Sequence, residues 1–233
     1  EWLKSLGVDK ATIEKLRANA GANLVISQVT FKPRRLIWSQ GPLGGVYATL
    51  DTAKVDAARD PLRRPIDAKG FAGFQYDASE WFAMQPNGLW RVALYDADGK
   101  QQQAVPPEIA ADKSDPHAPT TEVIPALSCI RCHVEGGLRP FADDQTRLQS
   151  KALLGSYDPQ IASRVAEFYD EPRLQRQAAF DRSTYEDACQ KACGLSSKEL
   201  AEALGNVVRR FSYLPITVDT AAHEVGLTAD DFK

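Results

Sequence analysis

The residues with the most specific chemical spacing form the segment Cys129-Ile130-Arg131-Cys132-His133. Two thiols three positions apart can add to the two vinyl groups of a haem, and the histidine that follows can bind its iron. The spacing therefore predicts one covalently attached haem c, with Cys129 and Cys132 as attachment points and His133 as an axial ligand. The haem would carry most of the chemistry itself.

Two other kinds of site use the same spacing of cysteines. A thioredoxin-like dithiol begins a helix after a buried strand, whereas this motif follows a loop-like segment, residues 121–128. Zinc is the stronger rival, because Cys189 and Cys193 could complete a four-cysteine site. That site would leave His133 unexplained, so haem attachment is favoured and zinc is the remote alternative.

Cys189 and Cys193 also need an interpretation of their own. Gly194, not histidine, follows Cys193, so the pair does not predict a second haem. On one helix face their Cα atoms would be about 6 Å apart, which is within the range of a disulfide. We expect a disulfide here, as an oxidising compartment would allow, with two buried thiols as the alternative.

The sequence offers no obvious sixth ligand for the iron. The chain has three histidines and one methionine, and residues 134–233 contain no methionine. The distal candidates are Met84, His223 and Tyr76. Met84 is otherwise explained by core packing, and His223 by a surface position on a short helix. His117 lies between two prolines and is expected to face solvent.

Two glycines, Gly136 and Gly137, follow the motif closely. A loop of this kind can offer a backbone carbonyl to the far ring nitrogen of His133, which would fix the ring and raise its basicity. The alternative is that the glycines only let the chain turn away from the haem edge.

Composition describes an ordinary globular protein. Of 233 residues, 43% are hydrophobic and 25% are charged, and the net charge of −3 gives no reason to expect a nucleic-acid partner. No apolar run approaches the ~20 residues of a membrane span. The chain starts at Glu1 without a signal peptide. Because this type of haem is attached outside the bacterial cytoplasm, we expect a mature periplasmic or secreted protein.

The pattern of elements predicts an α+β fold, with a mainly antiparallel β half, residues 1–120, before a helical, cytochrome c-like half, residues 121–233. The two halves could form one compact unit. The β half is expected to hold a helix at 10–20, ended by Gly21, and strands at 24–31, 35–38, 46–50, 80–84, 90–95 and 101–105. Helices are expected at 161–169 after Asp158-Pro159, at 200–211 after a Ser196/Glu199 capping box, and at 218–225 after Thr217.

Three segments resemble a family of secreted bacterial c-type cytochrome domains of the planctomycete type. They are Tyr76-Asp77-Ala78-Ser79-Glu80 running into Pro86-Asn87-Gly88-Leu89, then Tyr95-Asp96-Ala97-Asp98-Gly99-Lys100, then Ser128-Cys129-Ile130-Arg131-Cys132-His133. The similarity extends over much of residues 31–232, including the ending around His223. This chain has Tyr76-Asp77 where the family has His-Asp. The resemblance implies a cytochrome and brings no known substrate.

Two classes of function follow. The first is electron transfer with a redox partner protein or within a larger respiratory assembly, and this class is favoured. The second is a haem enzyme or gas-binding protein with an open distal site, such as a peroxidase-like activity. The scarcity of histidine argues against the second class, because distal acid–base assistance usually uses one.

Overall fold

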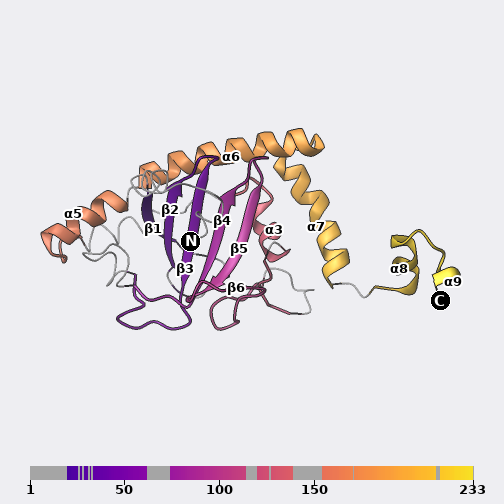
Figure 1. Cartoon of the computed structure of the whole chain (residues 1–233), viewed down its shortest axis with the longest axis horizontal. Coiled ribbons are helices and arrows are strands. Elements are labelled where there is room, and N and C mark those ends of the chain that lie inside the picture. Colours follow the sequence, from indigo (N-terminus) through magenta and orange to yellow (C-terminus); the bar gives the residue numbers. More distant parts are fainter. Residues whose placement is uncertain are drawn as a thin grey trace.

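The chain folds into one antiparallel sheet followed by helices, which confirms the expected α+β class (Figure 1). The computed structural model describes residues 20–25, 27, 29–30, 32, 34–61, 74–113, 120–125, 127–138, 154–169, 171–213 and 216–232. The expected N-terminal helix lies outside these residues except for its end: Ala20 and Gly21 belong to a strand.

The sheet is a six-stranded meander in which each strand pairs with the next one in the chain. Its strands are β1 (Ala20–Val25), β2 (Arg34–Gln40), β3 (Gly45–Asp51), β4 (Ala78–Met84), β5 (Trp90–Asp96) and β6 (Gln101–Gln102). Strands β2 to β5 confirm the expectations. The first strand was expected at 24–31 but spans Ala20–Val25, and within it a Cβ on Gly21 would lie 2.5 Å from Nε1 of Trp38.

Strand register places one apolar set on a single face. Trp38 pairs with Tyr47, Tyr47 with Phe82, and Phe82 with Val92. These side chains form the main core with Leu36, and Leu138 and Leu174 from the helical half pack into the same core. Side chains from both halves therefore contribute to one core.

The helices within the described residues are α3 (Leu127–His133), α5 (Pro159–Phe168), α6 (Glu171–Cys193), α7 (Ser197–Tyr213), α8 (Val218–Glu224) and α9 (Ala229–Phe232). Local signals predicted α5, α7 and α8. Asp158 accepts from the Gln160 N–H, and Thr217 accepts from the Thr220 N–H. Ser196 and Glu199 form the expected capping box, with a Ser196 N–H to Glu199 Oε2 distance of 2.8 Å.

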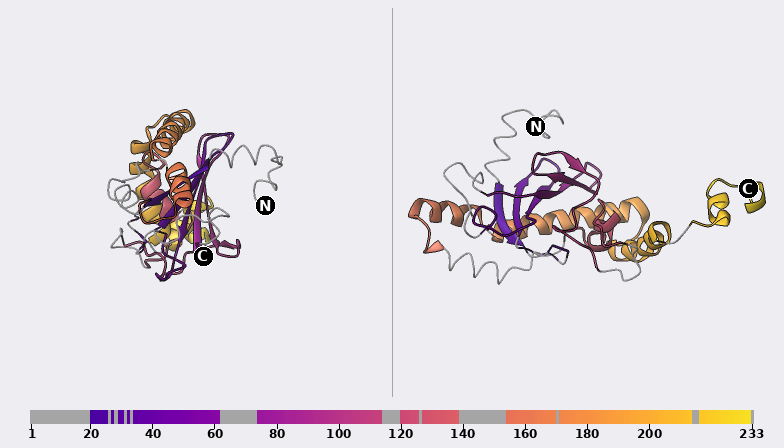
Figure 2. Two further views of the ribbon diagram at one scale, coloured as in Figure 1. Left: turned by 90° about the vertical axis from the view of Figure 1, so that its left-hand side faces the viewer. Right: turned by 90° about the horizontal axis from the view of Figure 1, so that it is seen from below.

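Helix α6 is the longest of the described helices, and the sequence indicated only its end, where Cys189 and Cys193 were placed on one helix face. It crosses the end of the sheet where the β2–β3 and β4–β5 hairpins turn (Figures 1 and 2). Asp181 accepts from the Gly45 N–H at 3.0 Å and from the Tyr47 hydroxyl at 2.6 Å. Further along, Ala188 lies against Gly88. These hydrogen bonds hold the helix on the sheet, and burial raises the pKa of Asp181.

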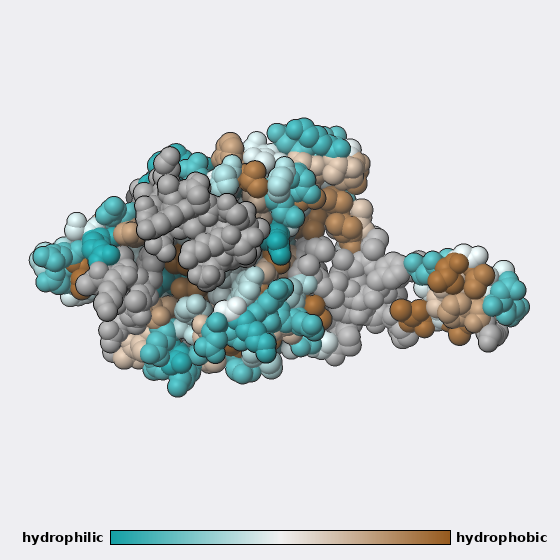
Figure 3. Space-filling view, viewed as in Figure 1, coloured by the Kyte–Doolittle hydropathy of each residue, from teal (hydrophilic) through white to brown (hydrophobic). Residues whose placement is uncertain are grey.

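The C-terminal helices α8 and α9 pack on each other, around Ala222, which is fully buried. Apolar side chains gather at the surface of this end (Figure 3); they are Ile216, Val218, Val225, Leu227 and Phe232. Among the helices that the structure describes, none combines the length and apolar character needed to cross a bilayer.

Candidate haem-attachment site

Helix α3 carries the Cys-x-x-Cys-His motif, and its start is fastened to the sheet. Val123 forms a bridge with Val105, which belongs to a second buried cluster with Leu94. The Ser128 hydroxyl accepts from the Ile124 N–H at 3.0 Å and lies buried. Because the chain is anchored directly before Cys129, the position of the first cysteine relative to the sheet is fixed.

Cys129 and Cys132 lie one helical turn apart and differ in exposure. Cys129 is buried, Cys132 is partly exposed, and the two are not joined in a disulfide. The Cys129 Sγ lies 3.6 Å from Glu80 Oε1 on β4. Residues at i, i+3 and i+4 share one helix face, so both sulfurs and the His133 ring project from the same side of α3.

Glu80 belongs to a buried ionic cluster on the same face of the sheet. Arg34 donates to both oxygens of Asp51, to Thr49 Oγ1 and to Glu80 Oε2. Burial alone would lower the pKa of Arg34, but the two carboxylates raise it above its ordinary value. The guanidinium is therefore charged, and it holds the Glu80 carboxylate beside the Cys129 sulfur.

The His133 ring is oriented by the loop that follows it. Its Nδ1 lies 3.0 Å from the Gly137 carbonyl oxygen. A carbonyl oxygen can only accept, so Nδ1 carries the proton in this contact. In the neutral ring the lone pair then lies on Nε2, which is the nitrogen that would bind a metal. The sequence-based expectation of a carbonyl supplied by this glycine loop is confirmed.

Both glycines of this loop need a left-handed backbone. Their φ angles are +70° at Gly136 and +65° at Gly137. A Cβ on Gly137 would also lie 2.3 Å from Trp90 Nε1. The loop therefore does more than turn the chain, because it brings its backbone into contact with β5 while presenting a carbonyl to His133.

Aromatic side chains of the sheet support the ring of His133. The Phe82 ring on β4 has its centroid 4.7 Å from the His133 centroid. Trp90 on β5 meets both Phe82 and Tyr47 edge to face, with centroid distances of 6.4 and 6.0 Å. The histidine is thus the end of an apolar aromatic cluster that belongs to the main core.

The distal candidates lie in three different places. Met84 is buried at the end of β4, where its Cβ and Cγ approach Gly44 on the β2–β3 hairpin, as core packing predicts. His223 is exposed on α8. Tyr76 is half-buried just before β4, and His117 lies outside the described residues. These contacts do not bring Met84, His223 and Tyr76 together at one site.

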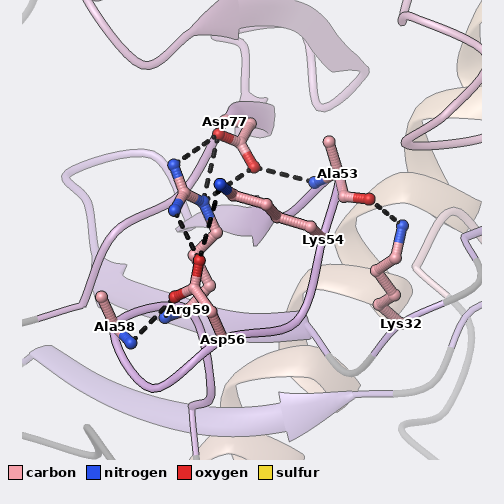
Figure 4. Close-up of polar contacts among 7 residues, drawn as sticks. All are labelled: Lys32, Ala53, Lys54, Asp56, Ala58, Arg59 and Asp77. Atoms are coloured by element: carbon pink, nitrogen blue, oxygen red, sulfur yellow. Dashed lines mark hydrogen bonds and ion pairs between the residues drawn. The ribbon is translucent and has the colours of Figure 1, made fainter.

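Tyr76 directly precedes Asp77, which belongs to a polar cluster before the start of β4 (Figure 4). Arg59 pairs with Asp56 at 2.9 Å and with Asp77 at 3.1 Å, and Asp77 accepts from the Ala53 N–H. Lys32 donates to the Ala53 carbonyl. The cluster ties the β3–β4 connection to the start of β4, and so fixes the backbone on either side of Tyr76.

The second cysteine pair lies near the end of α6. Both residues carry free thiols, so the structure does not contain the expected disulfide. The physical reason is that the two sulfur atoms have different partners: the Cys189 thiol is hydrogen-bonded with Tyr185, and the Cys193 Sγ with the Cys189 carbonyl oxygen. Cys189 faces inward beside Tyr185 and is 1% exposed, whereas Cys193 is exposed and contacts the Cys189 carbonyl oxygen at 3.2 Å. Burial raises the pKa of the Cys189 thiol.

The structure gives the four-cysteine zinc site no support. Within the described part of the chain, no group of three or more His, Cys, Asp or Glu side chains could hold a metal ion. This finding bears on zinc rather than on haem, because haem iron needs a single protein ligand at the motif.

Sequence reasoning missed several residues around the motif. Glu80 and Phe82 lie two positions apart on β4, and the period of a strand puts them on one face. A carboxylate on the same strand face as a buried aromatic side chain could therefore have indicated that Glu80 faces the motif. The approach of Trp90 to Gly137 had no local signal, since it joins separate elements.

Comparisons with known proteins add no relative: no family model, no curated protein and no solved structure matches this chain significantly.

Proposed function

We propose that the protein is a monohaem c-type cytochrome that transfers electrons outside the cytoplasm. In this proposal the haem is joined to Cys129 and Cys132, and its iron is bound by His133 Nε2. The observation that carries the proposal is the contact between His133 Nδ1 and the Gly137 carbonyl. An iron-binding histidine usually donates its other ring N–H in this way, which fixes the tautomer and raises the basicity of the ligand.

The residues present fit a covalently held haem. Both thiols and the imidazole project from one face of α3, and neither thiol is consumed in a disulfide. Cys132 and His133 are partly exposed, whereas Cys129 and Phe82 are buried. A planar apolar ring attached here would lie between the core and the surface, as electron exchange with a partner protein requires.

Each residue then has a defined part. Cys129 and Cys132 hold the group, His133 orients it, Phe82 keeps water from the histidine ring, and Glu80 places a negative charge beside the attachment point. Bound haem would supply a one-electron iron couple. The partner would be a redox protein or a larger respiratory assembly.

The test is to produce the chain with a haem-attachment system and record its reduced and oxidised spectra. We expect one haem per chain that stays attached after denaturation, and its loss in a Cys129→Ala, Cys132→Ala variant. A purified protein without a haem band, carrying one zinc per chain, would overturn the proposal.

A second candidate is a haem protein with an open distal site, acting as an enzyme or a gas binder. The observation that favours it is the placement of the distal candidates: Met84 is buried against Gly44, and His223 is exposed on α8. Carbon monoxide distinguishes the two, because rapid binding to the reduced protein requires an open sixth position. A spectrum that carbon monoxide leaves unchanged supports the electron carrier.

A further inference from the structure

The loop that orients His133 is held from outside by the corner between α6 and α7. Ser197, the first residue of α7, is 1% exposed, and its hydroxyl accepts from the Gly136 N–H at 2.7 Å. The same hydroxyl donates to Glu186 on α6, whose second carboxylate oxygen accepts from the Ser197 N–H at 3.0 Å. Glu186 therefore fixes the direction in which the Ser197 lone pair points.

A second anchor holds the other side of the same loop. Arg182 on α6 donates from Nη2 to the Leu138 carbonyl oxygen at 2.7 Å. Its guanidinium also covers Gly136, where a Cβ would lie 3.1 Å from Nη1. The anchors at Gly136 and Leu138 flank Gly137, which is the residue whose carbonyl accepts from His133.

We propose that Ser197 and Arg182 are positioning residues for His133, acting through the backbone of residues 136–138. The inference rests on the proposed function, because it assigns these residues a role toward the iron ligand. Moving Gly136 or Leu138 would lengthen the Nδ1 to carbonyl contact, and the imidazole would become a weaker electron donor. A weaker donor stabilises ferric iron less, so the midpoint potential of the haem would rise.

The chain provides a matched control beside Ser197. The hydroxyl of the neighbouring Ser196 caps α7, and its partner is Glu199 on α7 itself. A Ser196→Ala variant therefore weakens the start of α7 at the same corner without losing the bond between Ser197 and Gly136. Comparing the two variants separates the orientation of His133 from the general stability of the α6–α7 corner.

The experiment uses the haem-loaded protein and two readouts that do not depend on turnover. Ser197→Ala and Arg182→Gln should each raise the midpoint potential. They should also speed deuterium exchange of the His133 Nδ1 proton, followed by NMR in the reduced state, by about tenfold or more, the factor that corresponds to 1.4 kcal/mol of hydrogen-bond strength. Ser196→Ala should match the wild type in both, and Ser197→Thr, which keeps the hydroxyl, should restore both values.

The outcomes separate this inference from the proposed function. A wild-type protein without attached haem would overturn both. A haem-loaded wild type whose potential and Nδ1 exchange are unchanged in Ser197→Ala and Arg182→Gln would overturn the positioning role alone. If Ser197→Ala does not fold, Arg182→Gln decides the matter by itself, because Arg182 is only partly buried.

Discussion

The two cysteine pairs of this protein both lie on helices, and they differ in what surrounds them. Cys129 and Cys132 lie on a seven-residue helix fastened to the sheet, and the next residue is a histidine whose ring is oriented by a carbonyl. Cys189 and Cys193 lie at the end of a 23-residue helix, before Gly194. The pairs also differ in spacing, three positions against four, so the comparison teaches that the spacing of a haem motif and an oriented histidine occur together at only one of the two pairs.

The largest effect should come from removing each pair in turn. Cys129→Ala with Cys132→Ala should abolish covalent haem, because the thioether bonds cannot form. Cys189→Ala with Cys193→Ala should keep one haem per chain. Haem staining after denaturing electrophoresis measures both, and equal staining of the two variants would contradict the distinction between the pairs.

The next largest effect should come from substituting one glycine after each cysteine pair, Gly137 and Gly194. Gly137→Ala combines a left-handed backbone with a contact 2.3 Å from Trp90, and should cost about 2–4 kcal/mol in the free energy of unfolding. Gly194 also has a positive φ, but its Cβ would meet nothing within 4 Å. Gly194→Ala should therefore cost only about 1 kcal/mol. Denaturant unfolding of the two variants checks the difference, and similar costs would contradict the loop's close packing.

Charge beside the first pair should tune the haem more modestly. Glu80→Gln removes a negative charge near Cys129, which favours the ferrous state and should raise the midpoint potential. Glu202→Gln on the exposed side of α7 is the matched control and should leave the potential unchanged. Redox titration of both variants measures the shift. A lowered or unchanged midpoint potential in Glu80→Gln would contradict an electrostatic effect of this carboxylate on the haem.

The smallest effect is a difference in reactivity within the second pair. The thiolate is the reactive form, and burial raises the pKa of Cys189, so fewer of its thiols are ionised near pH 8. Iodoacetamide should modify Cys193 first. The rate of modification at Cys189 should go on increasing when the pH rises above the pKa of an ordinary thiol. Mass spectrometry over a pH series follows both sites. If both resist modification until a reductant is added, the disulfide exists after all.

Signals carried by neighbouring residues were sufficient for much of the fold. The Ser196–Glu199 capping box predicted the start of α7, and strand alternation predicted β2 to β5. Most of helix α6 was not predicted, apart from its end at Cys189 and Cys193, because its inward face is not purely apolar. The buried residues Leu174, Ala178, Asp181 and Tyr185 follow a helical period, but a carboxylate occupies the third of them. The hydrogen-bond partners of Asp181 are Gly45 and Tyr47, which lie over 130 residues away in the sequence. They could not be inferred from the residues around Asp181.

The same limit applies to the candidate site. The motif and the glycine loop are contiguous, so the contact between His133 and Gly137 could be expected from residues four positions apart. The contact between Gly136 and Ser197 spans 61 residues and depends on how α6 crosses the sheet. Prediction therefore succeeded for the contact between His133 and the glycine loop, and failed for the helices that hold this loop.

The meander order of the sheet has a consequence for folding. Strands that pair with their chain neighbours close short loops, so the β2–β3 and β4–β5 hairpins can form early and locally. The contacts of α6 with Gly45 span 136 residues, and the entropy of closing so long a loop delays them. In the sequence, Cys129 and Cys132 follow the strands of the sheet and precede helix α6. We therefore expect the motif to stay accessible on a preformed sheet until α6 and α7 dock and lock the loop behind it.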